Sequence, residues 1–469
     1  MAFSSVQFLF VFLPLSLAVY WLCPKWLRNA VLAAFSLLFF AWAGLKGAAI
    51  LVLLAGINWL GGLSLGRLAH KRPLLILLIL LDLAVLGGFK YAGFAAETVN
   101  ALVPGLLPVL SPALPLGLSF YVFTAIGYCA DVAAGKVESE KNPIRFAVFL
   151  AFFGHGPSGP IVRYGQQAPQ LDPGSETRRV SADRFCYGIK RLVLGLAKKA
   201  IIADQLALIY AKAASVPAAT LPAPILVLGY TAYMMQLYFD FSGYSDMAVG
   251  LGQIFGFHFP ENFRYPFLSG SVTEFWRRWH ISLGSWFRDY VYIPLGGSRC
   301  SRSRWLLNVF LVWGLTGLWH GAAWNFVLWG LFFAVLLAAE KLWYGHGLEK
   351  TRLLKHLYML PLLAVSFVLF NAADLPAAGQ QIAALFGFGG LPAAGVESLY
   401  YLRSYAVVLV IALLGATPLP AKAVQRLRDT SAGSAVLSVA EPVALVLLLA
   451  LCTAYLVDGS FNPFLYFRF

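Results

Sequence analysis

The chain has 469 residues, of which 60% are hydrophobic and only 12% are charged, and its formal net charge is +14. Ordinary soluble domains carry about 25% charged residues, so a soluble fold could not cover this much apolar surface. Because a helix needs about 20 apolar residues to cross a bilayer, the long apolar stretches predict an all-α polytopic membrane protein with about ten to twelve spans. The basic excess suits cytoplasmic loops facing anionic lipid, whereas nucleic-acid binding would need a soluble basic face, so we expect no nucleic-acid partner.

The first apolar stretch, Val6–Leu22, has the length of a signal peptide or of a short span. No Lys or Arg precedes Lys25, and no small-residue cleavage site is clear, so we expect a retained first span. The cysteines are scattered and form no C-x-x-C motif, which predicts packing residues rather than disulfides or ligands. They are Cys23, Cys129, Cys186, Cys300 and Cys452.

The distribution of Lys and Arg predicts the topology. Basic residues follow the expected spans that end near residues 22, 65 and 134, whereas the connection Ala92–Ala113 contains none. Since Lys and Arg gather in cytoplasmic loops, we expect the N-terminus outside and the basic loops, including 163–199, inside. The chain shows no fixed repeat or disordered linker, so we expect one domain over 1–469 with a catalytic core at about 145–345. The run Ala373–Tyr401 is expected to be an external loop with a short helix.

The middle of the chain, Tyr238–Gly321, is much richer in polar and aromatic residues. Its first part places two carboxylates, Asp240 and Asp246, inside an apolar stretch. A charge at membrane depth is costly, so these groups either pair with cations and cap backbone, or face an aqueous tunnel. Both interpretations stay open. The candidates for lining such a tunnel are Asp240, Ser242, Tyr244, Asp246, Trp276, Trp319 and Asn325.

A capping-box pattern at Ser271–Glu274 predicts the start of a helix that continues to Tyr290. Tryptophans and arginines on one helix are typical of the inner membrane interface. Helical spacing places four side chains on one face: Trp276, His280, Leu283 and Phe287. Three arginines lie off that face: Arg277, Arg278 and Arg288. We therefore expect His280 to point into the protein.

A second histidine, His320, lies between two strongly apolar segments, with glycines at positions 314, 317 and 321. Small residues let helices pack closely and leave room for a ligand. With an ordinary pKa of about 6.5, histidine is a suitable general base near neutral pH. An ionisable residue inside a membrane is a functional candidate by default, so we predict that His320 is catalytic.

Two motifs of other enzyme classes can be set aside. The segment Gly62–Gly66 matches the G-x-S-x-G pattern of hydrolases, but it lies in an expected span without a strand-turn-helix context, so it predicts helix packing. No H-E-x-x-H or comparable spacing is present, so we expect no metal ligands.

The stretch Tyr238–Asn325 resembles the membrane-bound O-acyltransferase family. Its bacterial branch includes O-acetyltransferases of alginate, peptidoglycan and cellulose, and the D-alanine transferase of teichoic acids. The resemblance rests on YFDFSGYSDMAVGLG (238–252), NFRYPFLSGSVTEFWRRWHISLGSWFRDYVYIPLGGSR (262–299) and TGLWHGAAWNF (316–326). Weaker matches are MAFSSVQFLFVFLP at the N-terminus, SGPIVRY at 158–164 and NPFLYFRF at the C-terminus. The resemblance therefore runs along nearly the whole chain.

This resemblance implies a ring of helices around a funnel-shaped centre. The near-invariant histidine of the family falls on His320, and its upstream histidine falls on His280. It implies that a cytoplasmic thioester donor is used, that the acyl group is delivered outward, and that an extracytoplasmic partner protein acetylates the polysaccharide. The segment Gly154–Pro157 departs from the apolar lead that relatives often have, which makes His155 a third candidate.

Together, residues and resemblance predict a membrane O-acetyltransferase in the cell inner (cytoplasmic) membrane, in contact with the lipid bilayer, with no permanently bound cofactor. Its donor would be acetyl-CoA or the thioester of a carrier protein. His320 would act as the base or carry the acetyl group briefly, while His280, tryptophans or amide N–H groups orient the thioester. D-alanyl transfer, lipid or protein acylation, and transport without chemistry are the alternatives, and the acceptor polymer stays open.

Access to the site is expected through a two-sided tunnel that meets at His320. Its cytoplasmic mouth would be bordered by the helix Glu274–Tyr290. The basic side chains Arg277, Arg278 and Arg288 could attract the donor's phosphates there, or could simply mark the inner side of the membrane.

Overall fold

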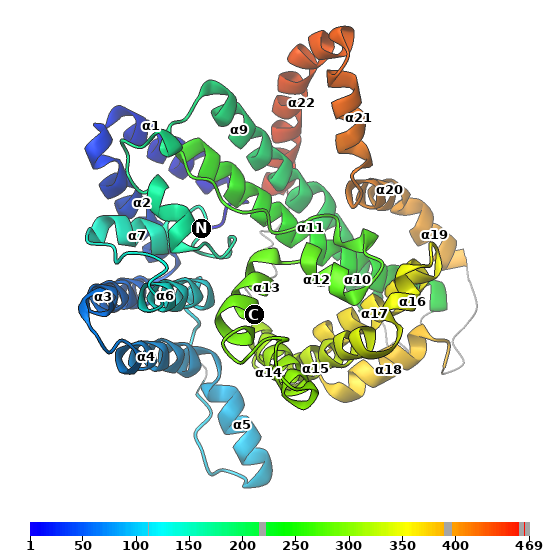
Figure 1. Cartoon of the computed structure of the whole chain (residues 1–469). Coiled ribbons are helices and arrows are strands. Elements are labelled where there is room, and N and C mark those ends of the chain that lie inside the picture. The colour runs from blue at the N-terminus through cyan, green and yellow to red at the C-terminus, as the bar shows by residue number, and fades with distance from the viewer. Residues whose placement is uncertain (111, 215–221, 389–395, 459–463, 465–469) are drawn as a thin grey trace.

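The structure is a computed structural model that describes residues 1–110, 112–214, 222–388, 396–458 and 464 (Figure 1). Helices dominate, and these ranges contain no β-strand. The α-helices are α1 (Leu13–Leu22), α2 (Arg28–Ala43), α3 (Leu45–Arg67), α4 (Arg72–Lys90), α5 (Ala92–Leu102), α6 (Leu118–Ala133), α7 (Pro143–Ala151), α8 (Tyr164–Gln167), α9 (Ala182–Ala197), α10 (Asp204–Ala214), α11 (Ala223–Phe255), α12 (Val272–Arg278), α13 (Ile281–Phe287), α14 (Arg302–His320), α15 (Trp324–Ala339), α16 (Gly345–Glu349), α17 (Leu354–Asn371), α18 (Leu375–Leu385), α19 (Val396–Ser404), α20 (Ala406–Gly415), α21 (Leu419–Arg428) and α22 (Ser431–Asp458). Short π-helices extend four of them: η1 (Phe8–Phe12), η5 (Lys198–Ala203), η8 (Arg288–Tyr292) and η9 (Glu340–Tyr344). The 3-10 helices are η2 (Lys25–Leu27), η3 (Ala168–Gln170), η4 (Glu176–Arg178) and η7 (Pro266–Leu268).

Six helical segments in the described part of the chain are long and apolar enough to cross a membrane, or seven if the bent pair α19–α20 is one span. The six are Lys25–Ala43, Leu45–Arg67, Arg72–Lys90, Trp324–Glu349, Leu354–Asn371 and Ser431–Asp458. This is fewer than the ten to twelve spans predicted, because apolar helices such as Phe8–Leu22 and Leu118–Ala133 are shorter than 18 residues. The chain is a multi-pass membrane protein.

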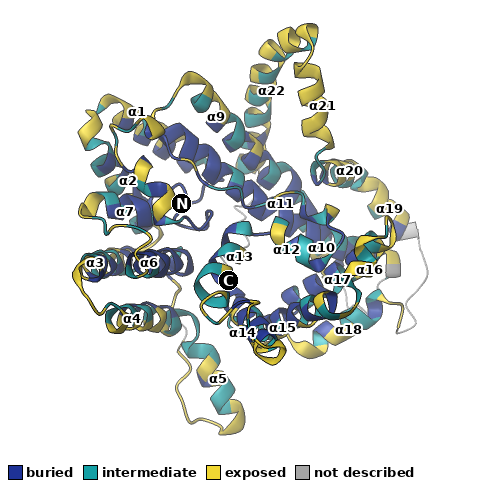
Figure 2. Ribbon diagram, viewed as in Figure 1, coloured by how far each residue is buried: buried dark blue, intermediate teal, exposed yellow. Residues whose placement is uncertain are grey.

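The outer surface of the helices is apolar. Leu77 and Leu80 on α4, and Val446 and Leu447 on α22, are all exposed. Figure 2 shows that α22 and the outer side of α4 are largely exposed. In contrast, α6 and the sides of α9 and α11 that face the interior of the protein are buried. Apolar surface of this extent is covered by lipid in a membrane protein.

The centre of the fold is the long helix α11, which runs beside α9 (Figure 1). The two helices approach closely at facing glycines. A Cβ atom added to Gly188 would lie 2.8 Å from the carbonyl oxygen of Gly250, and Gly195 and Gly243 face each other in the same way. Small residues at a helix contact permit this approach. The close packing sets the carboxylates of α11 against the lysines at the end of α9.

The prediction of one helix from Ser271 to Tyr290 is wrong. The predicted start is confirmed, because Ser271 Oγ accepts a hydrogen bond from the Glu274 N–H at 3.0 Å. The helix then ends at Arg278, and His280 adopts a left-handed conformation with φ of 45° before α13 begins. Asn262 explains the break, since its carbonyl oxygen and side-chain oxygen accept the first N–H groups of α13, each at 3.0 Å.

Because the helix breaks, the four side chains expected on one helical face do not form a continuous stripe. Trp276 belongs to α12, whereas Leu283 and Phe287 belong to α13. His280 lies at the junction between the two helices.

Several local predictions can be compared directly with the structure. The G-x-S-x-G segment lies inside α3, where Gly62 packs against Tyr128, as helix packing requires. All five cysteines are free. The expected external loop Ala373–Tyr401 contains α18 and the start of α19, and its residues 389–395 lie outside the described ranges. Of the C-terminal motif NPFLYFRF, only Phe464 is described.

Candidate active site

His320 is the last residue of α14 and lies at the tight turn into α15. A Cβ atom at Gly317 or Gly330 would collide with the backbone of the facing helix, so these glycines allow α14 and α15 to pack closely. The chain leaves α14 in an extended conformation at Gly321. This geometry holds the His320 side chain inside the protein, where only 3% of the residue is exposed.

Aromatic rings surround His320. The ring centroids of Trp319 and Trp329 lie 4.9 Å from that of His320, and the centroid of Phe370 lies 5.3 Å away. Trp319 was predicted from the sequence, but Trp329 and Phe370 were not. No pattern marks these two among the many aromatic residues of apolar helices, because their role depends on how α15 and α17 pack against α14.

A small cavity of about 10 Å³ lies beside His320. Trp276, a predicted lining residue, borders it. The other residues that line the cavity are Leu237, Phe275, Trp279, Trp329, Phe333, Ser366, Phe367 and Phe370. This volume holds about one water molecule, so side chains must move before an acetyl group can enter from this side.

His280 is also buried, and its position is fixed by the break between α12 and α13. Its Nδ1 lies 3.3 Å from Asn262 Oδ1, and its ring centroid lies 4.7 Å from that of Phe241 on α11. The ring of Trp319 contacts His280 at 5.9 Å and His320 at 4.9 Å between centroids. The structure therefore brings His280, His320, Trp276 and Trp319 into one aromatic region.

The predicted carboxylates lie in ion pairs between α11 and the segment where α9 continues into η5. Lys199 Nζ lies 2.7 Å from Asp240 Oδ1. Lys198 Nζ lies 2.6 Å from Asp246 Oδ2, and Arg191 also pairs with Asp246. Lys199, expected in a basic cytoplasmic loop, is instead only 2% exposed. These contacts favour the structural interpretation of both carboxylates over a role in lining a tunnel.

The remaining predicted lining residues also contact protein. Tyr244 stacks on Phe3 with 4.8 Å between ring centroids, which ties the N-terminus to α11. Ser242 is buried on α11. Asn325 Nδ2 donates to carbonyl groups at the end of α17, including that of Ala372 at 3.2 Å. Asn325 thus fixes α17 against the start of α15, close to His320.

The three arginines proposed to attract the donor differ in their contacts. Arg278 bonds to Glu274 on its own helix at 2.5 Å, and Arg288 bonds to Asp289 at 2.7 Å. Arg277 is exposed and forms no ion pair within the described residues. It is therefore the arginine best placed to meet an anion from solution.

The third candidate histidine, His155, is buried between the rings of Phe152 and Phe259. Their centroids lie 6.1 and 4.9 Å from that of His155. His155 does not border the small cavity beside His320. Its contacts are those of a core residue.

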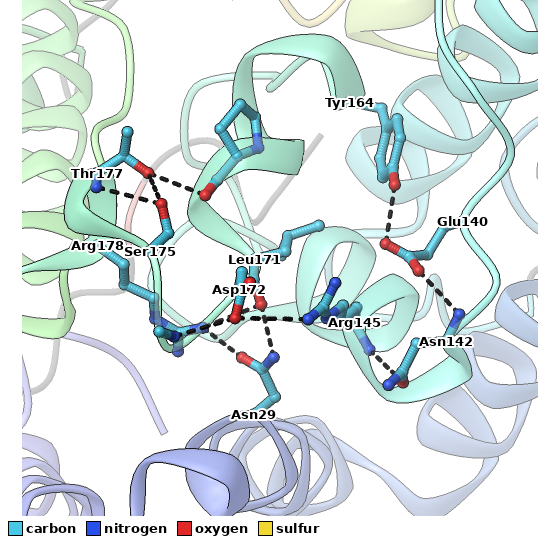
Figure 3. Close-up of polar contacts among 12 residues, drawn as sticks. Asn29, Glu140, Asn142, Arg145, Tyr164, Leu171, Asp172, Ser175, Thr177 and Arg178 are labelled. Carbon is cyan, nitrogen blue, oxygen red and sulfur yellow. Dashed lines mark hydrogen bonds and ion pairs between the residues drawn. The ribbon is translucent and has the colours of Figure 1, made fainter.

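A wider groove of about 980 Å³ lies away from His320, around the N-terminus of α7. Figure 3 shows polar contacts in and next to this groove: Tyr164 Oη donates to Glu140 at 2.8 Å, and Arg145 pairs with Asp172, which lies beside the groove, at 3.5 Å. Glu140 is held by the Tyr164 hydroxyl, and Arg145 is paired with a carboxylate. The groove therefore resembles a polar surface that ties loops together more than a site for a charged ligand.

Comparison with known proteins decides the family. The sequence model of the membrane-bound O-acyltransferase family matches residues 118–372, which include α6 to α17 and both His280 and His320. The chain belongs to the membrane-bound O-acyltransferase family. It is therefore a membrane-embedded O-acyltransferase, as its resemblance predicts.

Individual relatives of this O-acyltransferase match over most or all of their length. A probable alginate O-acetylase, AlgI, of Azotobacter vinelandii is 39% identical, with 100% of both chains covered. A protein with the same description from Pseudomonas putida is 38% identical, again over 100% of both chains. A peptidoglycan O-acetyltransferase of Helicobacter pylori is 30% identical, with 83% of this chain and 80% of the relative covered.

Proposed function

We propose that this O-acyltransferase takes acetyl from acetyl-CoA at the cytoplasmic face and passes it across the inner membrane to a hydroxyl of a cell-surface polysaccharide. The observation that carries the proposal is the full-length match to relatives described as alginate O-acetylases. An alginate-like exopolysaccharide is therefore the proposed acceptor, and an extracytoplasmic partner protein completes the transfer. Peptidoglycan is the second candidate, because a Helicobacter pylori relative is described as acting on it.

His320 is the proposed general base. Its imidazole would remove the proton of the acceptor's hydroxyl while that hydroxyl oxygen adds to the thioester carbonyl of the donor. The tetrahedral intermediate then collapses, the carbon–sulfur bond breaks, and the leaving thiolate takes the proton from the imidazolium. One ester forms, one thioester is consumed, and no oxidant or metal is needed.

The surroundings of His320 suit this reaction. Aromatic walls exclude water, which protects a thioester from hydrolysis and strengthens electrostatic interactions in the site. Trp276 Nε1 is buried and has no hydrogen-bond acceptor among the described residues. Since Trp276 borders the cavity with His320, its N–H is available to the oxyanion of the tetrahedral intermediate.

The proposed catalytic unit spans residues 145–345 of one domain, and its donor side faces the cytoplasm. Lys and Arg follow alternate spans, which supports an external N-terminus and internal basic loops. In a chain without native cysteines, a cysteine at Leu102, which is 83% exposed, should react with an impermeant maleimide applied from outside. A cysteine at the exposed His70 should not react. The reverse labelling pattern would overturn the orientation.

Deletion of the gene in its source bacterium tests the function. Base-labile acetate should disappear from the exopolysaccharide and return when the wild-type gene is restored. Inside-out membrane vesicles that enclose the periplasmic contents, and with them the partner protein and the polymer, should transfer radiolabel from acetyl-CoA to the polymer fraction. Unchanged acetate in both exopolysaccharide and peptidoglycan would refute the proposal, whereas loss from peptidoglycan alone would replace the proposed acceptor.

A further inference from the structure

The bend between α4 and α5 contacts the end of α14 directly. Lys90, the last residue of α4, donates from Nζ to the carbonyl oxygen of Trp319. Tyr91 Oη donates to the carbonyl oxygen of Leu318 at 2.9 Å. Phe94 on α5 places its ring 5.5 Å from that of Trp324, at the start of α15. The bend thus contacts both helices that meet at His320, although Lys90 and Trp319 are 229 residues apart in sequence.

These hydrogen bonds are accepted by carbonyl groups at the end of α14 that have no partner within the helix. The last four carbonyl groups of a helix have no partner within the helix, and their dipoles favour a cation nearby. Leu318 and Trp319 lie in the last turn of α14, and the chain turns to an extended conformation directly after it. Lys90 and Tyr91 therefore cap α14 from a different helix.

The capped last turn of α14 also includes Trp319 and His320, whose rings belong to the proposed active site. The ammonium group of Lys90 lies 5.6 Å from the ring centroid of Trp319, within cation–π range. That ring contacts both His280 and His320. A displacement of Trp319 would therefore change the placement of both histidines.

We infer that Lys90 and Tyr91 are positioning residues that hold His320 in place for acyl transfer. They do not line the cavity beside His320, so they act through α14 and not on the substrate. Both lie outside the family-matched segment 118–372. The inference rests on the proposed role of His320.

The test compares variants of the full-length chain in membrane vesicles supplied with acetyl-CoA. Lys90→Met removes the donor and keeps the chain length, Lys90→Arg keeps a donor and the charge, and Tyr91→Phe removes one hydroxyl. Lys46→Met and Tyr400→Phe are controls at exposed positions. We expect Lys90→Met to lower kcat roughly ten- to a hundredfold because the base is misplaced. The KM for acetyl-CoA should stay within about twofold of wild type.

A conservative substitution at Lys90 distinguishes a positioning role from a general loss of structure. Lys90→Arg should recover most of the kcat lost in Lys90→Met, and Tyr91→Phe should show a smaller loss. Hydrogen exchange of the purified protein should rise in residues 314–326 of Lys90→Met and stay unchanged in α9 and α11. If Lys90→Met fails to accumulate, Tyr91→Phe decides the question by the same two measurements.

His320→Ala in the same assay keeps the two proposals apart. Full activity of a folded His320→Ala protein would overturn the proposed role of His320, on which the positioning role rests, and would leave the acetyl-transfer function standing. An inactive His320→Ala protein beside fully active Lys90→Met and Tyr91→Phe proteins would overturn only the positioning role. Both controls should match wild type.

Discussion

Two buried polar regions of this molecule are built in opposite ways. Between η5 and α11, the carboxylates of Asp240 and Asp246 pair with lysines at 2.7 and 2.6 Å. At the end of α14, His320 is packed among aromatic rings beside a small cavity. An ionised carboxylate buried in a membrane protein is stabilised by a nearby cation, whereas a neutral imidazole carries no charge to be compensated. The charged region therefore stabilises the fold, whereas the aromatic region places a titratable side chain beside a cavity.

Breaking the charged region should have the largest effect. Lys199→Met would leave the buried Asp240 without its cation, at a cost of about 3–5 kcal/mol. We expect the variant to fail to accumulate in membranes, as measured by immunoblot and by thermal unfolding of any purified protein. The double variant Lys199→Met/Asp240→Asn should recover part of the loss, because it also removes the carboxylate charge at Asp240; the ion pair of Lys199 with Asp204 stays lost. A single variant that accumulates and unfolds like wild type would contradict the structural role.

Changing the aromatic region should affect activity while the fold persists. His280→Asn keeps a residue type that tolerates the left-handed backbone at φ of 45°, so the protein should remain folded. We expect acyl transfer to fall about tenfold, because His280 orients the site and does not perform the proton transfer.

The comparison for His280 is with His320→Ala in the same vesicle assay. If His280→Asn were as inactive as His320→Ala, the two histidines would share the chemistry. Wild-type activity of His280→Asn would remove His280 from the site altogether.

The smallest effect should come from the exposed arginine on α12. Arg277→Gln should raise the KM for acetyl-CoA about two- to threefold at low salt, with kcat unchanged, because it weakens only the attraction of phosphates. The difference should vanish at high salt, where exposed charges are screened. Arg179→Gln, at another exposed arginine, is the control. A salt-independent loss of kcat in Arg277→Gln would show that the residue acts in the chemical step.

The sequence predicted the elements that depend on local pattern. Apolar stretches indicated the membrane helices, the capping pattern indicated the start of α12 at Ser271, and glycine spacing indicated close packing next to His320. The break at His280 could not be predicted, because it depends on hydrogen bonds to Asn262, which lies before α12 in an irregular segment. Lys199 resembled a loop cation until its pairing with Asp240 showed it to be buried.

The cap on α14 could not be predicted from the sequence either, because it depends on contacts between residues that are far apart in the chain. Lys90 stands at the end of an apolar helix, where a lysine is typical of a membrane boundary. Its contact with Trp319 joins residues 229 positions apart, and no periodicity reports such a contact. Long-range polar contacts are thus the part of this site that only the fold reveals.

The most direct measurement of the central claim is acetyl transfer by His320→Ala, in inside-out vesicles supplied with radiolabelled acetyl-CoA. The account predicts that transfer to polymer falls at least about a hundredfold, because the general base is lost. It also predicts that the amount of protein and its unfolding temperature stay close to wild type. Near wild-type transfer by a folded His320→Ala protein would contradict the claim that His320 performs the chemistry.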